Sequence, residues 1–309
     1  MKRATGAPSR SCETFEGAGA WSRQGRARRD THAWVFAVRP MGSGKYELGV
    51  IGAGAMGSAL LRAFVRSEAL AASSVVVADV RPGPLKALAE ETGVRATADN
   101  AEVTASAQTI LLAVKPQVLE AVLAPLTFTP QQLVISIAAG VTLARLEALT
   151  GPSQPLVRVM PNILATVGEA ASAYVGNDCA TPEHLALVHR LLSSVGTAVA
   201  VEEKLMDAVT GLSGSGPAFV ATFLEALIDG GVAAGLPRAE ASKLAAQTVL
   251  GAGRWLLETG GSPANLKDLV TSPGGTTIAG LRALEKSGLR SATIEAVVAA
   301  AQRSRELGG

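Results

Sequence analysis

A glycine-rich turn between an apolar run and a helical pattern most restricts the folds open to this chain. The turn reads Gly52-Ala53-Gly54-Ala55-Met56-Gly57 and follows residues 48–52, which have the pattern of a buried strand. In such a turn the first glycine makes the bend, the second admits a pyrophosphate to the backbone, and the third lets helix pack on strand. A tight turn without a ligand is the plainer interpretation, but these flanks favour a dinucleotide site formed by Gly52, Gly54, Ala55, Met56 and Gly57.

Strands and helices alternate after this turn. Apolar runs predict strands at residues 75–79, 110–114, 134–137, 156–160, 172–175 and 197–201. Helical patterns cover residues 56–65, 85–91 and 143–149, and another helix is expected to begin at Thr181-Pro182-Glu183. Thr129-Pro130-Gln131-Gln132 has the pattern of a short capping box. The alternation predicts an α/β fold, with a Rossmann-type doubly wound parallel sheet.

The strand pattern ends near residue 203, and an all-α half follows. Helices are expected at residues 207–234, 237–258, 263–271, 277–287 and 289–307. The expected domains are an extension at residues 1–45, a dinucleotide-binding domain at 46–202 and a helical substrate-binding and dimerisation domain at 203–309. So many apolar helix faces predict a homodimer or a larger homo-oligomer formed through this last domain.

Composition excludes several classes of protein. Hydrophobic residues make up 48% and charged residues 17%, which is typical of a well-buried globular chain. Residues 41–309 have a net charge of −3, so no basic surface for nucleic acid is expected. The uncharged run at residues 208–224 is 17 residues long and interrupted by three glycines and Pro217, so no membrane segment is expected there.

The cysteines and the first 40 residues indicate in which cellular compartment the protein is expected. The two cysteines, Cys12 and Cys179, suggest neither a disulfide framework nor a metal site and fit a reducing, cytoplasmic compartment. Residues 1–40 are rich in glycine, serine and arginine and are expected to be disordered. Their basic character faintly resembles a transit peptide, but a true start at Met41 is the favoured interpretation because the first strand follows at once.

Two side chains at the end of the second strand bear on the choice of cofactor. Asp79 stands where an acid usually accepts hydrogen bonds from the adenosine ribose, which favours NADH. Arg81 stands two residues later and could instead bind the 2′-phosphate of NADPH, unless it is only a solvated loop charge. The two signals conflict and leave the choice nearly even, with NADPH slightly favoured.

Further cofactor contacts are expected where later strands end, because ligands of open α/β sheets bind at the carboxyl ends of the strands. The candidates there are Ala113, Lys115, Pro116, Ala138, Ala139 and Asn162. The small side chains would admit a nicotinamide, and Lys115 would approach phosphate or substrate, although a plain loop lysine is the better interpretation from spacing alone. Asn162 would hydrogen-bond a bound ring or hold its own turn.

A second anion cradle occurs more than 200 residues after the first. Ser272-Pro273-Gly274-Gly275-Thr276-Thr277-Ile278 places two glycines and two hydroxyls at the start of a helix, which suits an oxyanion such as a carboxylate. A helix cap with turn residues is the alternative interpretation, at about even odds from the residues alone. Neither a serine–histidine–acid arrangement nor a pair of catalytic carboxylates stands out in the sequence.

These motifs together resemble pyrroline-5-carboxylate reductase over about residues 47–307, most specifically in residues 212–218 and 272–278. The resemblance implies reduction of 1-pyrroline-5-carboxylate, a small imino acid, to L-proline by NAD(P)H. It also implies cofactor contacts at Asn100 and acids near the substrate pocket at Glu203 and Asp268. The substrate loop would comprise Ser272, Gly274, Gly275, Thr276 and Thr277. Backbone N–H groups of Gly274, Gly275 and Thr276 would hold the substrate carboxylate, and the Thr277 hydroxyl would bond the ring nitrogen.

Two other functions stay open at this point. A β-hydroxyacid or 6-phosphogluconate-type dehydrogenase shares the plan of a Rossmann domain followed by helices. Such enzymes use a lysine early in the second domain, whereas no lysine occurs here between Lys204 and Lys243. A non-enzymatic dinucleotide sensor would leave residues 272–277 without a role.

Overall fold

The structure is a computed structural model, and it describes residues 45–308. The expectations for the N-terminal extension, including its disorder and a start at Met41, lie outside the described residues.

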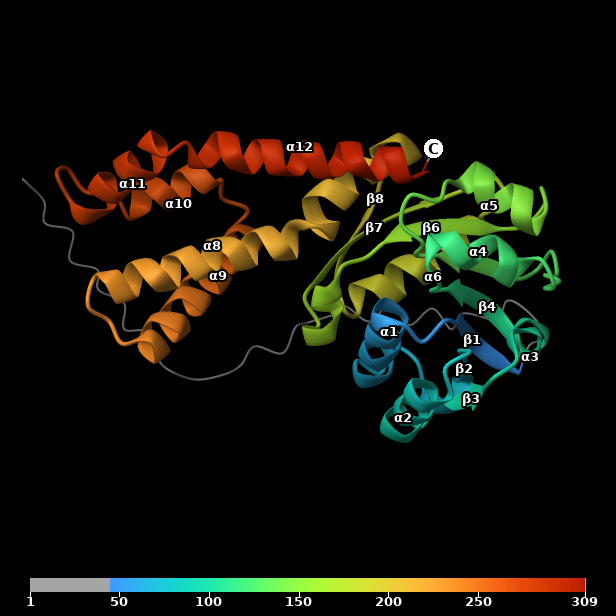
Figure 1. Cartoon of the computed structure of the whole chain (residues 1–309). Coiled ribbons are helices and arrows are strands. Elements are labelled where there is room, and N and C mark those ends of the chain that lie inside the picture. Colours follow the sequence, from blue (N-terminus) through green and yellow to red (C-terminus); the bar gives the residue numbers. More distant parts are fainter. Residues whose placement is uncertain (1–44, 309) are drawn as a thin grey trace, which may run out of the picture. The chain divides into compact units, whose positions relative to one another are not determined.

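An eight-stranded sheet occupies the first part of the described chain (Figure 1). Its strands run in the order β3-β2-β1-β4-β5-β6-β7-β8. They are β1 (Tyr46–Ile51), β2 (Val75–Ala78), β3 (Arg95–Thr97), β4 (Ala107–Leu112), β5 (Leu133–Ser136), β6 (Leu156–Met160), β7 (Ala170–Gly176) and β8 (Gly196–Ala200). All neighbouring pairs are parallel except β6 and β7. Only the short turn η2 (Ile163–Val167) joins those two strands, and without a crossover helix the chain must return antiparallel.

Helices cover both faces of this sheet, as the doubly wound prediction requires. They are α1 (Ala55–Arg66), α2 (Pro82–Thr92), α3 (Asn100–Ser106), α4 (Pro116–Leu123), α5 (Leu143–Thr150) and α6 (Pro182–Ser193), with a short turn η1 (Ala72–Ser74). One buried cluster joins α1, α2 and α6 to the sheet, and the other joins α3, α4 and α5 to its opposite face. Successive side chains of β4 show the division, because Leu111 enters the first cluster while Ile110 and Leu112 enter the second.

Residues 129–132 do not begin a helix, so the predicted capping box is wrong. The segment is a turn in which Gln132 N–H donates to the Thr129 carbonyl at 3.0 Å. The buried Gln132 amide also accepts from Thr129 N–H and donates to the carbonyls of Thr104 and Ala107. The hydrogen bond from Thr129 N–H to Gln132 Oε1 is one that a capping box would contain, but β5 begins at Leu133, so no helix follows.

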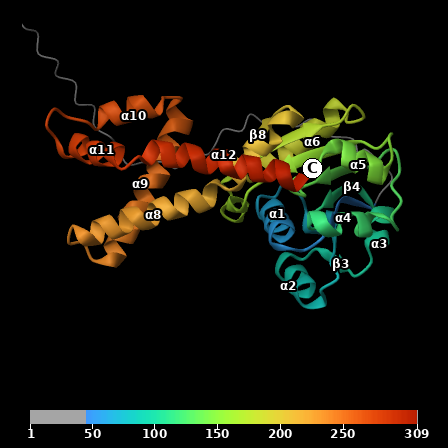
Figure 2. The ribbon, with the colours of Figure 1, turned by 45° about the horizontal axis from the view of Figure 1, so that its top comes forward.

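The second half of the chain is helical, as predicted. It contains η3 (Glu203–Leu205), α7 (Met206–Val209), the π-helical turn η4 (Thr210–Gly214), α8 (Gly216–Ala233), α9 (Arg238–Thr259), α10 (Pro263–Leu269), α11 (Thr276–Lys286) and α12 (Leu289–Gly308). Helices α8 and α9 lie side by side (Figures 1 and 2). The π-helical turn interrupts the single helix predicted over residues 207–234.

Helix α12 packs closely on this π-helical turn. A Cβ atom on Gly211 would lie 2.6 Å from the Val297 carbonyl and 2.8 Å from Ala301 N, so only glycine fits there. Farther along α12, the Ser304 hydroxyl donates to the Asp207 carboxylate at 2.6 Å. These contacts fix the C-terminal part of α12 to the beginning of the helical half.

The helical half buries few side chains in a single copy of the chain. Helices α8, α10 and α11 contain no buried residue, and large apolar side chains such as Phe223, Leu257 and Ile294 are exposed. Among the described residues, Glu203–Ala233 is also the one stretch long and apolar enough to cross a membrane by length and composition. An apolar surface of this extent requires a covering partner.

Candidate active site

The glycine turn after β1 has the shape of a pyrophosphate cradle. Gly52 has φ +104°, and a Cβ on Gly57 would lie 2.2 Å from the Gly52 carbonyl, so neither position accepts a side chain. Gly54 differs, because no atom of the chain lies within 4 Å of where its Cβ would be. The N–H groups of Ala55 and Met56 open α1 with no side-chain cap from Gly54. Open space over uncapped N–H donors fits a phosphate group.

The neighbouring strand ends lie at the same edge of the sheet. Strand β1 pairs with β2 on one side and β4 on the other, so the order in which strands are added to the sheet reverses at β1, and dinucleotides bind at such a switch point. Ala113 follows β4, and its N–H donates to the Ile51 carbonyl at 2.8 Å. Ala138 and Ala139 follow β5, and both side chains are small. Ala113 therefore lies beside the glycine turn, and Ala138 and Ala139 follow the next strand along the same edge of the sheet.

Other expected contacts at this edge differ in exposure. Lys115 is exposed immediately before α4, and Pro116 is the first residue of that helix. Asn100 is the half-buried first residue of α3, just after β3. Strand β3 lies two strands from β1 on the side of the sheet away from β5.

Asp79 follows β2 and is held by backbone and side-chain donors. Its carboxylate accepts from Ala53 N at 2.7 Å, Arg81 N at 2.8 Å, Arg81 Nε at 3.0 Å and Arg81 Nη2 at 3.1 Å. Burial raises the pKa of Asp79, but the hydrogen bonds from the Arg81 side chain and backbone and from Ala53 outweigh it and lower the pKa below its ordinary value. Asp79 is therefore a fixed carboxylate next to the glycine turn.

Asn162, predicted as a cofactor contact or as the holder of its own turn, is hydrogen-bonded within the chain. Its side chain is buried, and its Oδ1 accepts from Leu164 N at 3.2 Å and Ala171 N at 3.3 Å. Its Nδ2 donates to the Ser213 carbonyl at 3.0 Å. Asn162 therefore holds its own turn and ties β6 to the π-helical turn, and its acceptor is already in use.

Glu203, predicted to lie near the substrate, is hydrogen-bonded within the chain through one carboxylate oxygen. Its Oε1 accepts from Leu143 N at 2.7 Å, at the start of α5, and from Arg158 Nη1 at 3.1 Å. Arg158 is buried within β6 and was not singled out from the sequence, although an arginine inside the apolar run 156–160 was a signal for a buried ion pair. The carboxylate joins the sheet domain to the first residues of the helical half.

The diglycine loop before α11 keeps free donors, but not all of those predicted. Gly274 has φ +68°, and Gly275 N–H donates to the Ser272 carbonyl at 3.1 Å, so Gly275 N–H is not available to a substrate. Gly275 caps α11 without a side-chain hydrogen bond. Among the described residues, the N–H groups of Gly274, Thr276, Thr277 and Ile278 have no acceptor.

The surrounding side chains complete this loop. The Ser272 hydroxyl lies over Gly275, where a Cβ would come within 2.3 Å of it. Thr277 is half-buried, whereas Thr276 is exposed. Asp268 is exposed on α10, and its carbonyl accepts from Thr271 N at 3.3 Å. The loop is thus a pre-shaped set of backbone donors with hydroxyl groups beside it.

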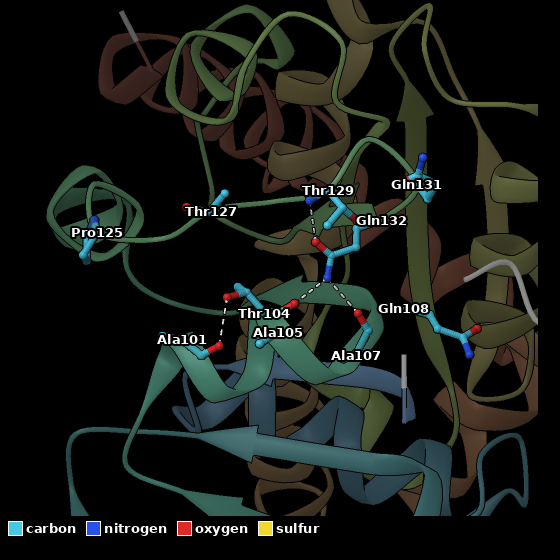
Figure 3. A pocket seen from close by; sticks show the side chains of 10 residues that line it. All are labelled: Ala101, Thr104, Ala105, Ala107, Gln108, Pro125, Thr127, Thr129, Gln131 and Gln132. Atoms are coloured by element: carbon cyan, nitrogen blue, oxygen red, sulfur yellow. Dashed lines mark hydrogen bonds between the residues drawn. The ribbon is translucent and has the colours of Figure 1, made fainter. Parts of the chain in front are cut away.

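A pocket of about 550 Å³ lies elsewhere, where β4 and β5 begin (Figure 3). Ala107 and Gln132 line it, and Figure 3 shows the Gln132 amide bridging to the carbonyls of Thr104 and Ala107. Its lining contains no charged side chain. Because it lies at the amino ends of the strands, it is separate from the glycine turn.

Comparison with known proteins agrees with this geometry. A family model described as pyrroline-5-carboxylate reductase dimerisation matches residues 203–307, and one described as NADP oxidoreductase coenzyme F420-dependent matches residues 47–140. A pyrroline-5-carboxylate reductase of Methanosarcina acetivorans is 50% identical over 264 residues, covering 85% of this chain and 98% of the relative. The chain belongs to the pyrroline-5-carboxylate reductase family.

Relatives from other organisms also align with this chain over nearly their whole length. The pyrroline-5-carboxylate reductase of Pisum sativum is 44% identical over 272 residues, which cover 87% of this chain and 99% of the relative. Among solved structures, the Coxiella burnetii reductase aligns with a TM-score of 0.80 at 33% identity, over 86% of this chain and 99% of that one. The Plasmodium falciparum reductase with NADP bound aligns with a TM-score of 0.78 at 32% identity, over 87% and 100%. The family is one of oxidoreductases with a Rossmann-like domain followed by a helical domain.

Proposed function

We propose that this chain reduces 1-pyrroline-5-carboxylate to L-proline, the last step of proline biosynthesis, with NAD(P)H as the hydride donor. The observation that carries the proposal is the diglycine loop, whose free N–H donors at an 11-residue helix suit a small carboxylate, in a chain that also has a dinucleotide cradle. The names of its relatives support the same reaction.

The cofactor would lie along the carboxyl edge of the sheet. The backbone of residues 52–57 would hold its pyrophosphate, Asp79 and Arg81 its adenosine end, and Ala113 and Ala138 its nicotinamide end. The NADP in the Plasmodium falciparum relative supports NADP as one cofactor, and NADPH is the slightly favoured hydride donor. When bound, this cofactor supplies the hydride.

The chain's own part in the reaction is mainly to position the substrate. The N–H groups of Thr276, Thr277 and Ile278 would bind the carboxylate, and the Thr277 hydroxyl would hydrogen-bond the ring nitrogen. A protonated imine is already an electrophile, so the chain needs no strong general acid. Because no strong general acid is needed, the absence of an evident catalytic pair of carboxylates in the sequence fits this reaction. Positioning of the substrate would then provide most of the rate enhancement.

A second copy of the chain would complete the assembly. The exposed apolar side chains of the helical half, and the dimerisation description of the family model that covers it, support a homodimer or a larger homo-oligomer. Burial between copies also accounts for the apolar stretch Glu203–Ala233 without a membrane. We propose the cytoplasm as its location and expect no nucleic-acid partner.

Substitution of Thr277 tests the substrate role. Thr277→Ala is expected to lower kcat on pyrroline-5-carboxylate about 100-fold, the usual effect of removing one well-placed donor. Thr277→Ser, which keeps the hydroxyl, is expected to restore most of the rate. Absorbance of the reduced cofactor follows turnover, and calorimetry measures cofactor affinity, which is expected to change little.

Thr248→Ala serves as the control, because Thr248 is an exposed helix residue whose hydroxyl donates only to the Leu244 carbonyl. Equal losses of turnover and of cofactor affinity in Thr277→Ala would contradict the assigned role. A failure of the wild-type chain to consume either reduced cofactor in the presence of pyrroline-5-carboxylate would contradict the proposed reaction itself.

A further inference from the structure

The π-helical turn η4 (Thr210–Gly214) contacts the carboxyl end of strand β6 at two points. The Ser213 carbonyl accepts from Asn162 Nδ2 at 3.0 Å. A Cβ atom on Gly214 would lie 2.5 Å from Met160 Cε, so the turn packs directly on the last residue of the strand. Residues 213 and 214 are thereby fixed at the edge of the sheet where the cofactor is expected.

This end of β6 lies beside the expected nicotinamide end of the cofactor. Strands β5 and β6 are parallel neighbours, and Ser136 pairs with Arg158. The segments that follow the two strands therefore leave the sheet side by side. Ala138 is in the first of these segments and Asn162 is in the second. Because dinucleotides lie across the carboxyl ends of such strands, the π-helical turn is a neighbour of the reacting ring.

The turn is also held from its other side. A Cβ atom on Gly211 would lie 2.6 Å from the Val297 carbonyl of α12, which leaves no room for movement toward that helix. Ser215 N–H donates to the Thr210 carbonyl, five residues earlier, at 2.9 Å. Single π-helical turns are frequent at functional sites, and a turn held on both sides keeps its side chains in fixed positions.

Three hydroxyl side chains occur at residues 210–215, and the turn itself uses two of them. Thr210 Oγ1 donates to the Met206 carbonyl at 2.9 Å, and Ser213 Oγ donates to the Val209 carbonyl at 3.1 Å. The third belongs to Ser215, which is half-buried and precedes α8 without a side-chain capping bond.

The reason that Ser215 does not cap α8 lies in the next residues. A serine at this position usually accepts from the second or third N–H group of the helix. Here the second residue is Pro217, which has no N–H, and Ala218 N–H donates to the Ser215 carbonyl at 3.0 Å. The Ser215 hydroxyl is therefore free for a ligand at the edge of the sheet.

We propose that the Ser215 hydroxyl hydrogen-bonds the carboxamide group of the nicotinamide ring and so fixes the rotation of the ring over the substrate. This inference rests on the proposed function, in which the diglycine loop already provides partners for the substrate's carboxylate and ring nitrogen. The carboxamide is the remaining polar group close to the reacting carbon. A serine hydroxyl can both donate to its oxygen and accept from its amino group.

Binding of the whole cofactor and of its adenosine half, without turnover, tests the proposal. NADPH contains the nicotinamide, whereas adenosine 2′,5′-bisphosphate lacks it. By titration calorimetry, Ser215→Ala is expected to weaken NADPH about three- to tenfold, the usual effect of losing one hydrogen bond, and to leave the bisphosphate within about twofold of wild type. The Tm of the cofactor-free chain is expected to stay unchanged, because the hydroxyl has no partner within the described residues.

Ser213→Ala is the matched control, because this hydroxyl belongs to the same turn and bonds only the Val209 carbonyl. The variant keeps the backbone carbonyl that Asn162 binds and is expected to change neither affinity. Equal weakening of NADPH and the bisphosphate by Ser215→Ala would overturn the proposal. So would an unchanged NADPH affinity, and a raised KM for 1-pyrroline-5-carboxylate would then assign the hydroxyl to the substrate. Failure of the wild-type chain to oxidise bound NADPH with this substrate would instead contradict the proposed reaction, and the binding comparison would still decide the role of Ser215.

Discussion

Two glycines of the cofactor turn are required for different physical reasons. Gly57 is fixed by the fold, because a Cβ there would meet the Gly52 carbonyl at 2.2 Å. Gly54 is not, because the chain leaves open space around it and its φ of −71° suits any residue. We infer that the open space over Gly54 serves the cofactor rather than the fold.

Gly54→Ala and Gly57→Ala should therefore fail in different ways. Gly54→Ala is expected to leave the unfolding free energy within about 0.5 kcal/mol of wild type and to weaken dinucleotide binding at least about tenfold. Gly57→Ala is expected to destabilise the cofactor-free chain by about 1–3 kcal/mol, since backbone must move. Denaturant unfolding and cofactor titration measure both effects. Equal destabilisation by the two variants would contradict this division of roles.

At the same scale, the sequence indicated candidate site residues but not their hydrogen bonds. The glycine spacing and the Asp79–Arg81 pair could be recognised because local sequence determines those features. The hydrogen bonds of Asn162 and Glu203 were not predicted because their partners, Ser213 and Arg158, lie 51 and 45 residues away. Local pattern contains no information on such distant contacts.

At the scale of elements, most helices and strands could be predicted from the spacing of apolar residues and from the glycines and prolines between segments. Strand β6 and the start of α6 were predicted at their observed positions. The three-residue strand β3 and the short helix α3 were missed because too few residues repeat in them to give a pattern. The break of α7 from α8 was missed because it depends on the packing of α12 against Gly211.

Helix α6 begins with a capping box that includes a titratable group. His184 N–H donates to Thr181 Oγ1, and Thr181 N–H donates back to His184 Nδ1 at 3.1 Å. Burial lowers the pKa of His184 below its ordinary value of 6.5, with a smaller opposing effect from Glu183. Protonation of Nδ1 would remove the acceptor and end half of the capping box.

This cap predicts a pH dependence of stability. As pH falls below 6.5, the unfolded chain binds a proton at His184 before the folded chain does, so the free energy of unfolding decreases toward the lower, folded pKa. His184→Gln keeps an acceptor at this position and does not titrate. Between about pH 7.5 and about pH 5.5, wild type should therefore lose more Tm than His184→Gln does. Parallel losses in both proteins would contradict the assignment.

At the scale of the whole molecule, the two halves of the chain differ in how much of their apolar surface a single copy buries. The sheet domain has two buried clusters of its own, whereas the helical half leaves apolar residues such as Phe223 and Leu257 exposed. We propose that the sheet domain binds the dinucleotide and that the diglycine loop of the helical half binds the substrate carboxylate. Reduction of an imino acid needs both of these sites.

Transfer of a labelled hydride tests this joint use of the two halves most directly. The chain is incubated with 1-pyrroline-5-carboxylate and reduced cofactor deuterated at nicotinamide C4, and the proline formed is analysed by mass spectrometry and NMR. We expect one deuterium per proline, on the carbon that was double-bonded to nitrogen, for one of the two C4-deuterated cofactor epimers. Proline without deuterium from either epimer, or no proline, would contradict direct transfer between the two sites.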